Sequence, residues 1–132
     1  MNQVLDDLKS ALELIKDKKH WTKGVFARAP RGAPVGTYDD AATKFCAVGA
    51  CIKASEARAN RERAILGELE KSLRLRDIYH PLYGLFTVAS AGFDATTISI
   101  IITFNDSRCH KDVVDLFKQT IKRLENEERS QG

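Results

Sequence analysis

Apolar residues recur at helical spacing near the start of the chain, with polar residues between them. They lie three or four positions apart and comprise Leu5, Leu8, Leu12 and Ile15. Such spacing places side chains on one face of a helix. Asn2 precedes this face as a candidate N-cap, and lysines follow it, which suits the polarity of a helix. The pattern predicts an amphipathic helix that begins next to Asn2.

Two more amphipathic helices are predicted in the second half of the chain. After Asn60, a candidate N-cap, the inward positions are Ile65, Leu66, Leu69 and Leu73. The other face carries both charge signs, as a solvated face does, at Arg61, Glu62, Glu68, Glu70, Lys71 and Arg74. The last helix has an apolar face formed by Val113, Val114, Phe117, Ile121 and Leu124. We predict one globular domain over residues 1–126 and a frayed tail over 127–132.

Residues 41–54 are apolar almost all round a helical wheel, which is typical of a helix in the middle of a domain. Small side chains form one stripe, which comprises Ala42, Cys46, Gly49, Ala50 and Ala54. A glycine inside a helix costs about 0.5–1 kcal/mol relative to alanine, so Gly49 predicts the close approach of another backbone. We predict a central helix over residues 40–55, capped by Asp39 or Asp40.

The helical pattern is interrupted between His20 and Tyr38. Five helix-breaking residues occur there, Gly24, Pro30, Gly32, Pro34 and Gly36. We predict a long loop whose tip, residues 29–36, is exposed, and long loops of this kind often carry function. Trp21 and Phe26 are expected to pin the start of the loop to the core.

Residues 78–106 are compatible with two structures. Apolar residues alternate from Ile98 to Phe104, which is typical of a strand, yet three of the isoleucines also fit a helix capped by Asp94. An isolated two-stranded sheet is only marginally stable, and the rest of the chain is helical, so the helix is favoured. The sequence predicts an all-α fold, a compact bundle of four to five helices around the central helix at 40–55. The alternative is an α+β fold with a small hairpin within 82–104.

The composition is that of an ordinary globular protein. Of the 132 residues, 43% are hydrophobic and 30% are charged, which argues against wholesale disorder. No apolar run reaches the roughly 18 residues that cross a bilayer, and the acidic start does not resemble a signal peptide. Three cysteines, an odd number, argue against a secreted disulfide framework. We expect a cytoplasmic protein without membrane contact.

Positive charge is concentrated in one segment, although the net charge is only +3. Residues 16–31 contain a single acid, Asp17, against Lys16, Lys18, Lys19, Lys23, Arg28 and Arg31. A basic segment beside Trp21 is a candidate binding surface for nucleic-acid phosphates or for an acidic protein. A solvated loop is the alternative interpretation, and it is favoured.

Cys46 is the candidate nucleophile, and the candidate bases are His20, His80 and His110. A mid-helix position among small residues favours a buried structural cysteine instead. No Cys-x-x-Cys pair occurs, so no metal site is expected. Phosphate-loop and dinucleotide fingerprints are also missing, so no cofactor is expected. Asn105 and Asp106 are interpreted as a helix-linking turn, or alternatively as side chains that face a pocket near Trp21.

Three motifs follow one another along the chain, Trp21-x-x-Gly24, Cys46-x-x-Gly49-Ala50 and Asn105-Asp106. In this order the chain resembles a family of small uncharacterised bacterial and phage proteins, a domain of unknown function. The resemblance covers residues 4–124 and implies a shared fold but no known reaction. The chain differs from the family pattern at Phe104, where Trp is usual, and at Cys109, where Thr or Ser is frequent.

These observations leave three functions open. The first is a small non-enzymatic binding protein, such as a phage or mobile-element accessory factor that binds or inhibits a host protein. The second is a small-ligand-binding protein or cysteine-dependent enzyme with a pocket near Trp21, Cys46 and Asn105-Asp106. The third is nucleic-acid binding through residues 16–31, which the modest net charge makes the weakest. Another protein is the expected partner.

Overall fold

The structure is a computed structural model that describes residues 2–75 and 94–131. Helices dominate this part of the chain: α1 Gln3–Ile15, α2 Ala47–Ala54, α3 Ala59–Leu75, α5 Asp94–Ser107 and α6 His110–Gln131. A 3-10 turn, η1, spans Lys18–His20, and two short antiparallel strands are β1 Ala27–Arg28 and β2 Lys44–Phe45. The all-α prediction is confirmed, and the two strands form the only sheet among the described residues.

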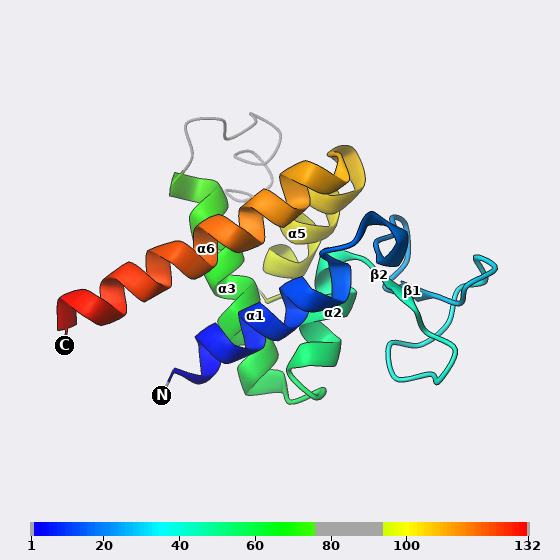
Figure 1. The fold of residues 1–132 in the computed structure, drawn as a ribbon, viewed down its shortest axis with the longest axis horizontal. Coiled ribbons are helices and arrows are strands. Elements are labelled where there is room, and N and C mark those ends of the chain that lie inside the picture. Colours follow the sequence, from blue (N-terminus) through cyan, green and yellow to red (C-terminus); the bar gives the residue numbers. More distant parts are fainter. Residues whose placement is uncertain (1, 76–93, 132) are drawn as a thin grey trace.

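The helices pack around one apolar core (Figure 1). α1 lies against α2 and α6, whereas α3 lies against α5 and α6. Each helix contributes fully buried side chains, among them Leu8, Val48, Leu69, Phe104 and Phe117. α2 contacts α1, α3 and α5, so it occupies the central place that its apolar composition predicts.

The first and last helices follow the predicted periodicity. The Asn2 side chain caps α1 by accepting a hydrogen bond from the Val4 N–H at 3.0 Å. The apolar face predicted for the last helix is buried in α6. α6 continues to Gln131, and residues 127–130 of its last turns are exposed, within the segment 127–132 for which the sequence predicted a frayed tail.

The predicted start of the central helix is wrong. α2 begins at Ala47, and the N-cap is Cys46 rather than Asp39 or Asp40. Asp39 instead caps a turn of its own, in which its Oδ1 accepts from the Ala41 N–H at 2.8 Å. The residues before α2 are extended because β2 pairs with β1, an interaction between distant residues that helical periodicity cannot reveal.

The predicted start of the third helix is wrong by a smaller margin. α3 begins at Ala59, and the first carbonyl to accept a helical bond is that of Arg58, so Asn60 lies inside the first turn. The preceding turn contains two left-handed residues, Glu56 at φ 55° and Ala57 at φ 58°. Their N–H groups donate to the carbonyls of Lys53 and Ile52, which closes the end of α2 as a Schellman turn.

The structure resolves part of the ambiguous region. α5 is helical from Asp94 to Ser107, so the helical interpretation is confirmed there and a strand over 98–104 is wrong. The remainder of the hairpin alternative, residues 82–93, lies outside the described residues, as does His80. None of the described helices has the length and apolar character needed to cross a membrane.

Residues 21–43 form a loop that projects from the helical body, at the right of Figure 1, and we call it the projecting loop. Main-chain bonds brace it internally, such as Ala29 N–H to Ala33 O at 2.8 Å. The Arg28 guanidinium adds three bonds, to Thr22 Oγ1 at 2.9 Å, to the Gly32 carbonyl at 2.8 Å and to the Lys23 carbonyl at 3.2 Å. Although long, the loop is therefore braced by hydrogen bonds of its own.

Candidate functional site

The three sequence motifs meet at Asn105, a side chain in the last turn of α5. Asn105 is fully buried, with 0% of its surface exposed. Its Oδ1 accepts hydrogen bonds from Trp21 Nε1 at 2.7 Å and from the Ala47 N–H at 3.0 Å. Since both partners can only donate, they fix which end of the amide faces them. One side chain thus joins the projecting loop to the start of α2.

The other end of the Asn105 amide binds the loop a second time. Its Nδ2 donates to the Thr22 carbonyl at 3.1 Å and to Asp106 Oδ1 at 3.0 Å. Asp106 Oδ1 also accepts from the Gly24 N–H at 3.1 Å. Each end of the amide therefore has two partners, and the predicted seam between Trp21 and Asn105-Asp106 is closed by internal hydrogen bonds.

Gly49 of the second motif is required by a close contact with the same loop. A Cβ at this position would lie 2.0 Å from the Phe26 carbonyl oxygen and 2.8 Å from its carbon. The Phe26 carbonyl also accepts from the Cys46 N–H at 3.1 Å. The small residue at position 49 is therefore explained by backbone approach, as the sequence predicted.

Cys46 is the N-cap of α2 and not a mid-helix residue. Its Sγ accepts from the Gly49 N–H at 3.3 Å, which is the role that Ser or Asp fills in other helices. Burial raises the pKa of the Cys46 thiol, and burial raises the pKa of Cys51 still further. A thiol that stays protonated at neutral pH is a poor nucleophile, so these positions favour a structural role.

Of the candidate bases, His20 and His110 lie within the described residues, and both have other surroundings than Cys46. His110 Nε2 lies 2.7 Å from the Ile15 carbonyl, and its ring packs at 5.5 Å from the Trp21 ring. His20 is exposed at the end of η1. Across residues 2–75 and 94–131, no group of three His, Cys, Asp or Glu side chains converges on a possible metal position.

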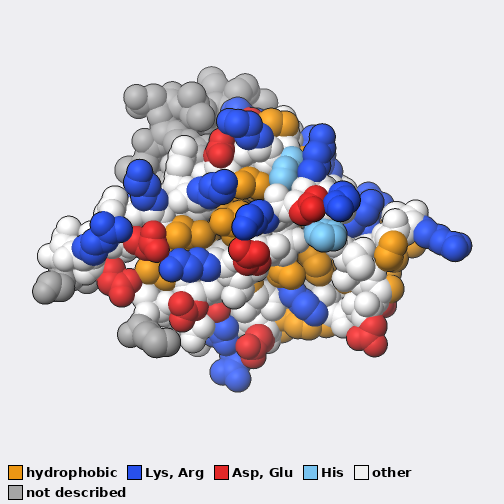
Figure 2. All heavy atoms as spheres, viewed as in Figure 1, with side chains coloured by type: hydrophobic (Ala, Val, Ile, Leu, Met, Phe, Trp, Pro, Cys, Tyr) orange, Lys and Arg blue, Asp and Glu red, His pale blue; other side chains and the backbone are white. Residues whose placement is uncertain are grey.

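The basic side chains of the predicted binding surface differ in their contacts, because some have partners within the protein and others are exposed. Lys16 pairs with Glu13 at 3.5 Å, and Lys19 pairs with Asp17 at 3.8 Å. A hydrogen bond from the Lys19 N–H lowers the pKa of Asp17. Arg28 braces the loop as described, whereas Lys18, Lys23 and Arg31 are exposed. Figure 2 shows that basic and acidic side chains alternate over α6 and α1 on the face it presents, so that face has no uniform charge.

Two aromatic side chains that the sequence analysis did not assign to a surface lie on the projecting loop. Phe26 is 41% exposed and Tyr38 is 46% exposed, and they are the two exposed large hydrophobic side chains among the described residues. The predicted pinning by Trp21 is observed, but Phe26 is anchored by its main chain while its ring faces outward. Their position in a Gly- and Pro-rich loop was the available signal.

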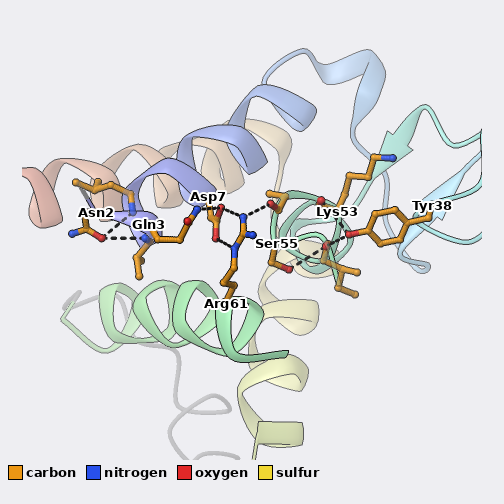
Figure 3. Close-up of polar contacts among 11 residues, drawn as sticks. Asn2, Gln3, Asp7, Tyr38, Lys53, Ser55 and Arg61 are labelled. Atoms are coloured by element: carbon orange, nitrogen blue, oxygen red, sulfur yellow. Dashed lines mark hydrogen bonds and ion pairs between the residues drawn. The ribbon is translucent and has the colours of Figure 1, made fainter. Parts of the chain in front are cut away.

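Tyr38 reaches the carboxyl end of α2 (Figure 3). Its hydroxyl donates to the Ile52 carbonyl at 2.7 Å and lies 3.2 Å from the Lys53 carbonyl. Lys53 Nζ lies 4.9 Å from the centre of the Tyr38 ring. Partial burial raises the pKa of Tyr38. This end of the loop is thus fixed to the helical body.

A buried ion pair was also missed by sequence reasoning. Asp7 of α1 is 3% exposed, and it accepts from Arg61 of α3 through Oδ2 at 2.9 Å and Oδ1 at 2.6 Å. Figure 3 shows Arg61 between α1 and the end of α2, where it also reaches the Ala54 carbonyl at 3.4 Å. The prediction of a solvated Arg61 is therefore wrong, because this contact joins three helices.

The described residues also line a small cleft between α3 and α5, away from the three motifs. Its volume is about 140 Å³, and its lining consists of Ala59, Glu62, Arg63, Leu66, Thr97 and Ile98. This is smaller than the usual 300–1,000 Å³ of a ligand pocket. The sequence analysis predicted a pocket along the Trp21 seam, and the cleft lies elsewhere.

Comparison with known proteins identifies a family but no characterised relative. The family model described as a family of unknown function (DUF6197) matches residues 1–123. Neither the curated proteins nor the solved structures contain a match to this chain.

Proposed function

Because the chain belongs to DUF6197, a family of unknown function, we propose a function from its structure, that of a small non-enzymatic binding protein. The observation that carries the proposal is the projecting loop with its two exposed aromatic side chains, Phe26 and Tyr38. Aromatic residues are enriched at protein interfaces because they bury a large area at little entropic cost. We propose that a partner protein binds this loop.

The bracing of the loop supports the same proposal. Ordering a flexible loop on binding costs conformational entropy, and a loop that is already braced by internal bonds loses less of it. Arg28 supplies three such internal bonds, and Asn105 fixes the start of the loop through Trp21 and Thr22. A loop that only connected two elements would not need this many internal hydrogen bonds.

The other functions find less support in the geometry. A cysteine-dependent enzyme needs an accessible thiolate, whereas Cys46 is buried and its pKa is raised. Nucleic-acid binding through residues 16–31 is less favoured because the Arg28 guanidinium already forms hydrogen bonds within the loop. In addition, Lys16 and Lys19 already pair with carboxylates. We therefore propose a host protein as the partner of a phage or mobile-element accessory factor, with binding in the cytoplasm.

Site-specific photocrosslinking tests the proposal in the cells that express the protein. A benzoylphenylalanine placed at Phe26 should form an adduct with one partner protein, since this ring is exposed while its main chain anchors the loop. The same probe at Lys118, an exposed position on α6, is the matched control and should give no such adduct. Equal adducts from both positions, or adducts from position 118 alone, would contradict binding at the loop.

A further inference from the structure

Residues 18–38, which include most of the projecting loop, carry positive charge without any acidic residue. Residues 18–38 contain five basic side chains, Lys18, Lys19, Lys23, Arg28 and Arg31, and no Asp or Glu. The first acidic residues after Asp17 are Asp39 and Asp40, at the far end of the loop. A segment of this length with one sign of charge attracts the opposite sign to its surface.

Two exposed cations of the projecting loop have no carboxylate partner within the described residues. Lys23 and Arg31 are exposed, and neither forms an ion pair with a described Asp or Glu. Some lysines on the helices are paired, since Lys9 pairs with Glu125 at 3.2 Å and Lys111 pairs with Asp115 at 3.2 Å. The Lys23 ammonium, which lies 5.4 Å from the centre of the Trp21 ring, and the Arg31 guanidinium therefore remain open to carboxylates of a partner.

The segments that carry the two exposed aromatic residues are both anchored on α2, at Gly49 for Phe26 and at Ile52 and Lys53 for Tyr38. Gly49, which meets the Phe26 main chain, and Lys53, which lies over the Tyr38 ring, are four residues apart and share one face of the helix. Four residues correspond to about 6 Å along a helix axis. The two anchor points of the loop are therefore about one helical turn apart on α2. At the right of Figure 2, hydrophobic side chains lie beside a basic one at the end of the projection.

Resting on the proposed function, we infer that the partner presents an acidic segment with an apolar anchor to this loop. Carboxylates of the partner bind the Lys23 ammonium and the Arg31 guanidinium, and an aliphatic or aromatic side chain packs against Phe26 and Tyr38. Complementary charge speeds association and excludes basic partners, while the aromatic contacts supply most of the binding energy. A nucleic acid would satisfy the charges but would leave the aromatic pair without an apolar anchor.

Selection from a ribosome-displayed library of random peptides on the immobilised full chain tests this inference. We expect the enriched peptides to combine Asp or Glu with an aromatic or aliphatic residue. By fluorescence anisotropy, Arg31→Glu and Phe26→Ala should each weaken the best peptide by about tenfold or more. Lys118→Glu makes the same charge reversal at an exposed position on α6 and should change affinity by less than about twofold.

Each other outcome has a defined meaning. Peptides without acidic residues that still lose affinity on Phe26→Ala overturn the acidic partner and leave the proposed function standing. No enrichment, or peptides that bind Phe26→Ala as well as the wild type, overturns both. An oligothymidylate that binds more tightly than the peptides, and equally to Phe26→Ala, identifies a polyanion surface and overturns the protein partner. Thermal unfolding of each variant verifies that the loss is not one of folding.

Discussion

Replacement of Gly49 by alanine should destabilise the protein, because α2 and the projecting loop are in backbone contact there. The new Cβ would lie 2.0 Å from the Phe26 oxygen, whereas an ordinary contact begins at 3.4 Å, so the two backbones must separate by the difference, 1.4 Å. That separation also breaks the 3.1 Å bond from the Cys46 N–H to the same oxygen. Both costs arise from main-chain atoms, which cannot move aside as a flexible side chain can.

The expected size follows from three contributions. Overpacking costs about 1–3 kcal/mol, and the lost hydrogen bond costs about 1 kcal/mol. The better helix propensity of alanine returns about 1 kcal/mol. The free energy of unfolding of Gly49→Ala should therefore fall by about 1–3 kcal/mol, as measured by urea denaturation followed by circular dichroism.

Gly67→Ala is the matched control for this measurement. Gly67 lies exposed inside α3, and a Cβ there would meet nothing within 4 Å. The same substitution should therefore stabilise the protein by about 0.5–1 kcal/mol. A Gly49→Ala protein that is as stable as the wild type, or that gains stability as Gly67→Ala does, would refute the close approach of the loop to α2.

Three further predictions concern other contacts. Asn105→Ala should lower the free energy of unfolding by about 2–4 kcal/mol in the same urea assay, because it leaves buried donors unpaired; a loss below about 1 kcal/mol would contradict the network. Glu56→Gly should raise stability by about 0.5–1 kcal/mol by relieving the left-handed backbone at φ 55°, and an unchanged midpoint would argue against that conformation. With a thiol reagent at neutral pH, Cys109 should react at once while Cys46 and Cys51, both buried with raised pKa, react only on unfolding; fast labelling of all three would be inconsistent with this burial.

The three motifs could be recognised in the sequence, but their shared contact could not. The Trp-x-x-Gly, Cys-x-x-Gly-Ala and Asn-Asp motifs are visible as separate groups in the sequence. A pocket was predicted where they meet. The structure instead fills that seam with the Asn105 amide, which binds Trp21, Thr22 and Ala47. Whether polar residues line a cavity or satisfy one another depends on distances between segments, which spacing along the chain does not contain.

The charge of a segment can be counted in the sequence, but the partners of its individual charged side chains cannot be predicted from it. Residues 18–38 contain basic residues and no acidic ones. The structure separates Arg28, whose guanidinium is used inside the loop, from Arg31, which is exposed. Arg61 is a further case, because its helical spacing indicated a solvated face while the fold pairs it with Asp7. Partner choice among charged groups is decided by tertiary contacts.

The sequence by itself determined the helical class, the buried faces of α1, α3 and α6, and the need for a small residue at Gly49, because these follow from local periodicity and volume. Only the tertiary structure decided where α2 begins, since pairing of Lys44 and Phe45 with the loop holds them extended against an apolar helical pattern. It also decided that Phe26 faces solvent. Those outcomes depend on contacts between residues far apart in the chain, which no local pattern encodes.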